Sequence, residues 1–260
     1  MNTQYNGTDR LLIKIVYTGL MTALVLIATL FFKVPVPFTN GYVHLGDSMI
    51  FVAAILLGWK GGAFAAGVGS ALADILGGYP HWALPTLIIK ILMGAIIGLC
   101  VSQKNRKGMY TLLGVIFAGS FAGFNGFLHY ILTKDVKNAS KVSDFVLQEL
   151  EVSSHGELLQ LTDKVQMQLL VVTLLIPLSI LLTSFIIAKY NHIKFRPSYT
   201  FSFVIAGTIM VFGYYIAYYL MIGNYIIPIF SIPWNVVQFV VGLLIAEIVI
   251  AGLRKAKAIQ

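Results

Sequence analysis

The fold of this chain is decided by residues 41–98, which read GYVHLGDSMIFVAAILLGWKGGAFAAGVGSALADILGGYPHWALPTLIIKILMGAIIG. They contain three apolar segments, each with ionisable groups near one end. Asp47 begins the first segment, Asp74 ends the second, and Lys90 lies about one and a half turns into the third. Because a charge in hydrocarbon costs at least ~2.5–3.5 kcal/mol, these three residues indicate a binding pocket or an ion path within a membrane.

The composition indicates a polytopic membrane protein. Hydrophobic residues make up 58%, charged residues only 11%, and the mean hydropathy is +0.86, whereas about a quarter of the residues are charged in soluble domains. The net charge of +8 comes from short basic runs between apolar segments, so it indicates membrane topology rather than nucleic-acid binding. The single cysteine and five histidines show no metal-ligand spacing, and no nucleotide-binding or catalytic motif is present. We therefore expect no enzyme, metal site or cofactor.

Hydropathy predicts eight membrane-spanning helices in one all-α membrane domain of 260 residues. The second and third are short and separated only by Lys60 and Gly61, which is typical of a tight helical hairpin. The predicted spans are Leu11–Phe32, Leu45–Trp59, Gly62–Leu76, Pro85–Val101, Tyr110–Leu132, Met167–Tyr190, Tyr199–Met221 and Pro233–Leu253.

The basic residues predict the orientation, because cytoplasmic loops retain Lys and Arg. If the N-terminus is inside, the basic runs after the fourth, sixth and eighth spans all become cytoplasmic. Both termini are then cytoplasmic. The long loop 133–166, in which acidic residues outnumber lysines, faces outward together with loops 33–44, 77–84 and 222–232.

With this topology, polar and aromatic residues gather in the outer third of the bundle. They predict a cavity that is open to the outside and closed below. The candidate substrate-binding residues are Asn40, Tyr42, His44, Tyr79, His81 and Trp82 from the loops, and Asp47, Asp74, Thr86, Lys90, Tyr214, Asn235 and Gln238 from the helices.

Several of these residues have a structural alternative. Asp47 is well positioned to cap its helix, and Asp74 is a possible partner of Lys90 in a buried ion pair. Asn235 and Gln238 are one turn apart and share a face that suits a heterocycle with donors and acceptors, although hydrogen bonding between helices is the alternative. Tyr214 and its neighbours Tyr215, Tyr218 and Tyr219 cannot all face a pocket. We therefore expect most of these four tyrosines to lie at the membrane interface. Trp82, at the mouth, has the alternative of an interface anchor.

Small residues recur at helical spacing, which lets helix backbones approach closely in lipid. The rows in the third and fifth spans indicate that both helices pack on protein. These rows are Ala63, Gly67 and Ala71 in the third span, and Gly114, Ala118, Ala122 and Gly126 in the fifth.

The first span carries another small-residue face, formed by Gly19, Ala23 and Ala28. This face has no obvious internal need. We therefore expect it to meet a partner.

Six sequence pieces stand in a recognisable order and spacing. They are P-x-P-x-x-x-G-Y-V-H-L-G-D (Pro35 to Asp47), L-L-G-W-K-G-G-A (Leu56 to Ala63), G-S-A-L-A-D (Gly69 to Asp74), P-T-L-I-I-K-I-L-M-G (Pro85 to Gly94), A-G-T-I-M-V-x-G-Y (Ala206 to Tyr214) and S-I-P-W-N-V-V-Q (Ser231 to Gln238). In these pieces the chain resembles the S component, the substrate-binding membrane subunit, of energy-coupling factor (ECF) vitamin importers, in the riboflavin-type group.

The resemblance implies a six-helix core formed by residues 11–101 and 199–253. Residues 110–190 would then be an inserted helical hairpin. It also implies a subunit of the prokaryotic plasma membrane that binds riboflavin, a pyridoxine-type or a hydroxymethylpyrimidine-type heterocycle from outside. This subunit would associate with a transmembrane coupling subunit and two cytoplasmic ATPases, docking through small residues of its first helix, and would topple to release its cargo.

The main alternative is a stand-alone ion-coupled transporter that uses Asp47, Asp74 and Lys90 as a relay. Such carriers show paired repeats, and no convincing internal repeat is present here.

Overall fold

The computed structural model describes residues 7–36, 41–102, 107–139, 142–189 and 197–256. Its long helices are α1 (Gly7–Phe31), α2 (Gly46–Leu76), α3 (Ala83–Ser102), α4 (Lys107–Ile131), α6 (His155–Lys189), α7 (Pro197–Ile222) and α8 (Ile232–Lys255). The shorter elements are β1 (Lys33–Val36), β2 (Gly41–His44), η1 (Pro80–Trp82), η2 (Leu132–Lys137), α5 (Asp144–Glu149) and η3 (Ile227–Ser231). Within the described residues, seven helices are long and apolar enough to cross a membrane, which confirms the all-α polytopic fold.

The helix α2 consists of two antiparallel halves. Gly58 interrupts it with φ 70° and ψ −172°, a conformation that is essentially restricted to glycine. A Cβ atom added to Gly62 would collide with Ala54, so the chain turns back on itself. An unbroken helix would separate Asp47 from Asp74 by about 40 Å, yet both lie at the same end of the bundle.

The tight hairpin predicted between the second and third spans is therefore present within α2. Its turn lies at Gly58 rather than at Lys60 and Gly61, because Gly58 is the residue that adopts the positive φ. Counting the two halves of α2 separately reconciles the seven long helices with the eight predicted spans.

Small residues bring α2 close to its neighbours, as the row in the third span predicts. A side chain on Gly67 would meet Ile91 of α3, and one on Gly69 would meet Val25 of α1. Helix α2 packs more extensively against α3 and α1 than against any other element.

The fifth span packs on protein as predicted, but the described part of its small-residue stripe does not make the contact. Ala122 and Gly126 are exposed, while Gly114 and Ala118 lie outside the residues whose side chains are described. Helix α4 packs instead through bulky residues on its other side, where Phe121 and Leu128 are buried and Phe124 lies 4.3 Å from the ring of Phe212.

The predicted loop 133–166 is partly helical. It contains most of η2, all of α5 and the beginning of α6, which starts at His155 rather than at Met167. The Glu157 N–H donates to Ser154 Oγ at 3.2 Å, and the Ser153 N–H donates to a Glu157 carboxylate oxygen at 2.8 Å. This reciprocal cap explains the early start of α6.

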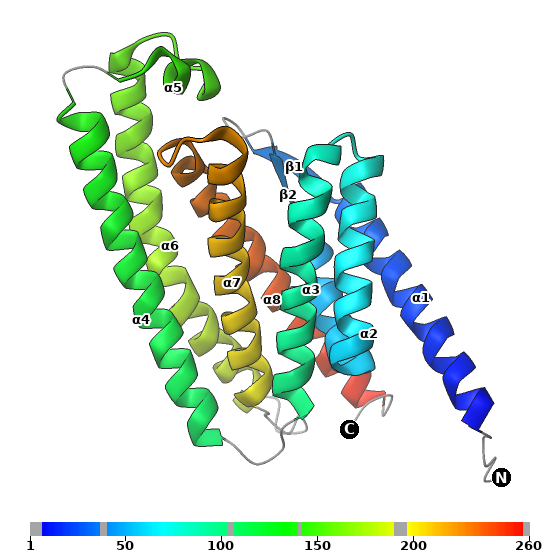
Figure 1. The fold of residues 1–260 in the computed structure, drawn as a ribbon. Coiled ribbons are helices and arrows are strands. Elements are labelled where there is room, and N and C mark those ends of the chain that lie inside the picture. Colours follow the sequence, from blue (N-terminus) through cyan, green and yellow to red (C-terminus); the bar gives the residue numbers. More distant parts are fainter. Residues whose placement is uncertain (1–6, 37–40, 103–106, 140–141, 190–196, 257–260) are drawn as a thin grey trace.

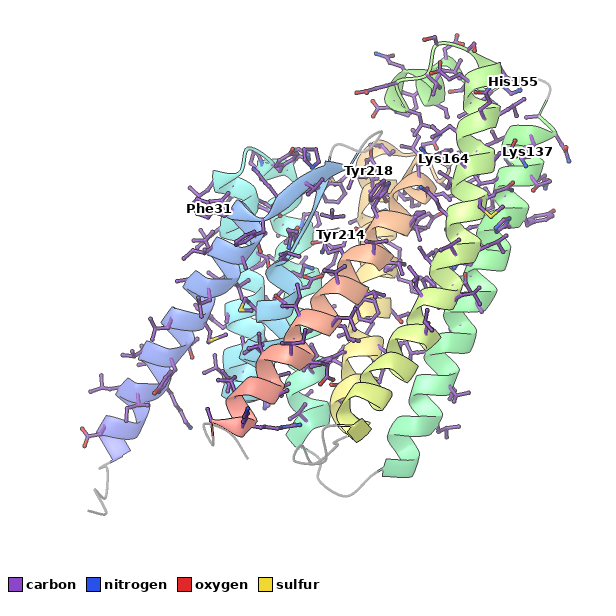
Figure 2. The ribbon with its side chains drawn as sticks, turned by 180° about the vertical axis from the view of Figure 1, so that it is seen from behind. Phe31, Lys137, His155, Lys164, Tyr214 and Tyr218 are labelled. Carbon is purple, nitrogen blue, oxygen red and sulfur yellow. The ribbon has the colours of Figure 1, made fainter. Side chains whose placement is uncertain are left out.

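Figure 1 shows the arrangement of the helices. Helices α4 and α6 lie side by side at one edge of the molecule, and α1 diverges from the bundle toward its N-terminal end. Figure 2 shows Lys137 and His155 at the upper end of the α4–α6 pair. The β1–β2 hairpin lies at the end of the bundle opposite the start of α1 and the end of α8.

A closely packed core lies between α2, α7 and α8. The rings of Phe51 and Phe203 stack at 4.6 Å, and Phe239 meets Phe51 edge-on at 6.4 Å. All three side chains are fully buried. An aromatic core therefore joins these three helices.

Candidate functional site

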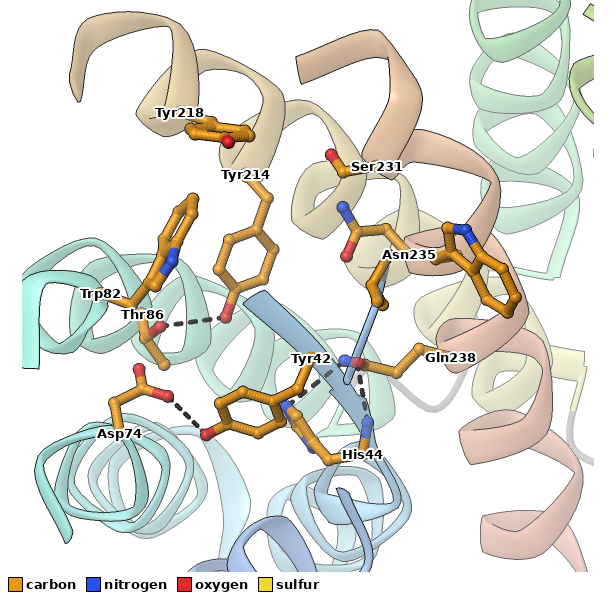
Figure 3. A pocket seen from close by; sticks show the side chains of 12 residues that line it. Tyr42, His44, Asp74, Trp82, Thr86, Tyr214, Tyr218, Ser231, Asn235 and Gln238 are labelled. Carbon is orange, nitrogen blue, oxygen red and sulfur yellow. Dashed lines mark hydrogen bonds between the residues drawn. The ribbon is translucent and has the colours of Figure 1, made fainter. Parts of the chain in front are cut away.

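A cavity opens at the end of the bundle opposite the termini. Together with its open mouth, it encloses about 570 Å³ of space between the side chains. The lining side chains come from the β-hairpin, η1, η3 and the neighbouring ends of α2, α3, α7 and α8 (Figure 3). They are Val36, Tyr42, His44, Asp74, Trp82, Thr86, Tyr214, Tyr218, Ser231, Trp234, Asn235 and Gln238.

Aromatic rings form one wall of this cavity. The indole of Trp82 lies 5.9 Å from the ring of Tyr214 and 5.4 Å from the ring of Tyr218, edge to face in both cases. Figure 2 shows both tyrosines inside the bundle. Tyr214 Oη also shares a hydrogen bond of 3.2 Å with Thr86 Oγ1. This wall offers flat apolar faces with polar tips, which suits a ring-shaped ligand.

Asp74 supplies a carboxylate to the cavity from the end of α2. Tyr42 Oη donates to Asp74 Oδ1 at 2.6 Å, and the Tyr42 ring packs at 4.8 Å on the ring of Tyr79. Burial, reinforced by the negative charge of Asp74, raises the pKa of the Tyr42 hydroxyl above its usual value. Tyr42 therefore remains a proton donor to the carboxylate.

A buried ion pair lies beneath the cavity. Lys90 Nζ donates to Asp47 Oδ1 at 2.5 Å, and both side chains have no exposed surface. Gln238 Nε2 donates to Asp47 Oδ2 at 2.9 Å, so both carboxylate oxygens have a partner. The ion pair beneath the cavity is consequently neutral as a whole.

His44 connects this floor to the β-hairpin. Its backbone N–H donates to Gln238 Oε1 at 3.0 Å, and its Nδ1 accepts from the Gly46 N–H at 3.0 Å. Burial lowers the pKa of His44 to about 4. The imidazole is therefore neutral near pH 7 and carries its proton on Nε2.

Two structural alternatives suggested by the sequence are wrong. Lys90 pairs with Asp47 rather than with Asp74, because the hairpin in α2 brings the first turn of α2 against the middle of α3. Asp47 does not cap α2, since Leu45 occupies the cap position and no side chain makes a capping hydrogen bond there.

The structure brings eight of the thirteen predicted site residues around one cavity. Asp47 and Lys90 lie beneath it, Tyr79 packs behind Tyr42, and His81 is exposed at the mouth with its ring 6.2 Å from Tyr79. Asn40 lies outside the described residues. The role of these residues in substrate binding remains a prediction.

Four lining residues were missed from the sequence: Val36, Tyr218, Ser231 and Trp234. Tyr218 follows Tyr214 by one helical turn, so the i, i+4 rule was the signal that would have found it. Tyr219 is 41% exposed and does not line the cavity, so the cluster does not face the pocket as a whole. In the described part of the chain, no group of three or more His, Cys, Asp or Glu residues could hold a metal ion.

Comparisons with known proteins identify the family. Residues 11–174, more than half of the chain, match the family described as "ECF-type riboflavin transporter, S component". This match continues through α4 into α6 and ends before α7.

A curated relative from Pyrococcus woesei, described as "Uncharacterized protein in gap 3'region", is 44% identical over 95 residues. The aligned part is 36% of this chain and 63% of the relative, so the chain covers less than two thirds of that protein. No solved structure matches the chain. The family match and the seven apolar helices lead to one conclusion: the chain belongs to the family of ECF-type riboflavin transporter S components and is a multi-pass protein of the cell membrane.

Proposed function

We propose that this S component captures a small water-soluble vitamin or vitamin precursor at the extracellular face. A flavin, a pyridoxine-type or a hydroxymethylpyrimidine-type heterocycle is the expected ligand. The observation that carries this proposal is the cavity itself, which combines an aromatic wall with a few convergent polar groups. Its position opposite the termini agrees with the basic loops, which predict that both termini are cytoplasmic.

A ligand screen on the purified protein tests this proposal. We expect one of these heterocycles to raise the melting temperature, because a ligand that binds only the folded state stabilises it. Mass spectrometry of the protein as purified should detect the same compound. If no member of the three classes binds or co-purifies, the proposal is wrong.

We propose further that cargo reaches the cytoplasm when the S component docks on a transmembrane coupling subunit with two cytoplasmic ATPases and topples. The docking face would be the small-residue face of α1, formed by Gly19, Ala23 and Ala28. Gly19 and Ala23 are exposed, and Ala28 is half-buried. No atom lies within 4 Å of a Cβ built on Gly19, so a partner helix has room to approach closely.

A bulky substitution tests this docking face. Ala23→Trp should abolish complex formation and uptake, because the indole fills the shallow groove on α1, while ligand affinity in detergent stays unchanged. The matched control is Ala122→Trp, which introduces the same side chain at an exposed alanine of α4. Normal recovery of the partners with Ala23→Trp would exclude this face. Loss of the partners with Ala122→Trp alone would locate the docking surface on the α4–α6 pair.

The α4–α6 pair would be an addition to a six-helix core formed by residues 11–101 and 199–253, while the family match over residues 11–174 itself runs through α4 and into α6. None of the described residues between 107 and 189 lines the cavity. The pair lies at one edge of the bundle, against α7 and α8 (Figure 1). This arrangement supports a role for residues 110–190 outside direct ligand contact.

The alternative function is a stand-alone ion-coupled transporter, and the geometry of the site does not favour it. A proton or sodium relay needs polar groups that can exchange partners along a path. Asp47 and Lys90 are instead fully buried and paired with each other, and Asp74 is bound to Tyr42. Uptake into cells with and without the ATPase subunits distinguishes the two mechanisms, since only the carrier works without them.

A further inference from the structure

We propose that Asp74 makes the cavity selective for a ligand that carries a positively charged, hydrogen-bond-donating nitrogen. This inference rests on the proposed vitamin-binding function and narrows its ligand. Among the expected heterocycles, it favours those with a protonated amine or a protonated amino-substituted ring over a neutral flavin.

The first observation is an unsatisfied acceptor. Asp74 is only 5% exposed, and its Oδ1 accepts from Tyr42. Its Oδ2 is buried and has no hydrogen-bond partner among the described residues. Figure 3 shows this second oxygen directed toward the space between Trp82 and Thr86. The Thr86 hydroxyl lies near this carboxylate and also shares a hydrogen bond with Tyr214. A buried acceptor without a partner is costly, and a ligand donor at this point would satisfy it.

The second observation is that the Asp74 carboxylate lacks a cationic partner within the described ranges. Lys90, the one lysine of the predicted site, is bound to Asp47 beneath the floor. Lys33 Nζ donates to the Gly77 carbonyl at 3.1 Å and lies 5.5 Å from the Tyr42 ring, without forming an ion pair with Asp74. The cavity thus presents one uncompensated carboxylate, and a cationic ligand would neutralise it.

The third observation is the aromatic wall of the same cavity. Trp82 and Tyr218 line the cavity together with Asp74, and aromatic faces attract cations most strongly where water is excluded. A flat heterocycle with a charged nitrogen would therefore interact favourably with both the wall and the carboxylate. A neutral ring would gain only the stacking.

The test is equilibrium binding to the full-length protein in nanodiscs, measured by isothermal titration calorimetry. Pyridoxamine and pyridoxine form a matched ligand pair, because an aminomethyl cation in one replaces a neutral hydroxymethyl group in the other. The aminopyrimidine precursor 4-amino-5-hydroxymethyl-2-methylpyrimidine and riboflavin complete the panel. The protein variants are Asp74→Asn and, as a control with the same chemical change at an exposed carboxylate, Asp144→Asn.

We expect a nitrogen-cation ligand to bind tightest, with pyridoxamine preferred over pyridoxine by about tenfold or more. Asp74→Asn should reduce this preference to near unity, while Asp144→Asn retains it. The ratio for the unmodified protein is informative even where Asp74→Asn does not fold, since an equal affinity for the matched pair contradicts the proposal.

The remaining outcomes also decide the matter. Tight binding of riboflavin with no loss in Asp74→Asn overturns the selectivity and leaves the proposed function standing. A cation preference that survives in Asp74→Asn overturns the assignment to Asp74. Failure of every compound to bind rejects both this inference and the proposed function.

Discussion

Replacing Lys90 by methionine tests how the floor of the cavity is held together. In the wild-type protein, Lys90 and Asp47 form a fully buried pair with Nζ and Oδ1 2.5 Å apart. The substitution leaves Asp47 buried with Gln238 as its remaining donor. Because removal of one member of a buried pair leaves an uncompensated charge, we expect the free energy of unfolding to fall by about 3–5 kcal/mol. The double variant Asp47→Asn/Lys90→Met should recover most of this loss, since no buried charge remains.

Two measurements on the same samples separate a structural role from a ligand-binding role for Lys90. Unfolding in detergent reports the free energy, and ligand titration of the folded fraction reports the affinity. Lys90 does not line the cavity, so we expect stability to fall while the affinity of the folded fraction stays close to wild type. A change in unfolding free energy below about 1 kcal/mol, combined with a large loss of affinity, would show that Lys90 serves the ligand directly.

Two further predictions concern the turn in α2 and the neutral imidazole. Gly58→Ala should destabilise the protein by about 1–3 kcal/mol, because the Gly58 φ of 70° and ψ of −172° strain any side chain. Gly126→Ala, at an open helical position, should not destabilise it. Equal melting temperatures for the two variants would contradict the hairpin. Burial lowers the pKa of His44 from 6.5 to about 4, so its contribution to stability is complete above pH 6.5 and falls by up to about 3 kcal/mol toward pH 4. His44→Asn should flatten this part of the stability profile measured by unfolding at several pH values, and an unchanged slope would assign it to another group.

The helices were predictable because their signals are local. Apolar runs of sufficient length define the spans, and the small-residue row through Gly67 correctly predicts the close packing of α2. The position of the turn was harder to predict, since three glycines lie between residues 58 and 62 and hydropathy does not distinguish them. The stripe that includes Ala122 and Gly126 predicted the wrong contact face for α4. Small residues permit close packing, but they do not show which face of a helix meets protein.

The site was predictable as a region and less so as a set of contacts. Residues such as Tyr42 and Gln238 were found because polar groups at the same end of several spans must lie near one another. Whether Lys90 pairs with Asp47 or with Asp74 depends on how each helix is rotated about its axis. This rotation cannot be inferred from a single sequence. Val36 and Trp234 were missed because apolar residues in a membrane protein give no contrast with their surroundings.

The central claim, that a vitamin-like heterocycle binds in this cavity, is tested most directly by tryptophan fluorescence. The chain has three tryptophans: Trp82 and Trp234 line the cavity, while Trp59 follows the α2 turn at Gly58 and is 46% exposed. Titration of the heterocycle panel should change the emission of the wild-type protein saturably. The change should persist in Trp59→Phe and nearly vanish in the double variant Trp82→Phe/Trp234→Phe. A signal that depends on Trp59, or no saturable response to any compound, would contradict binding at this site.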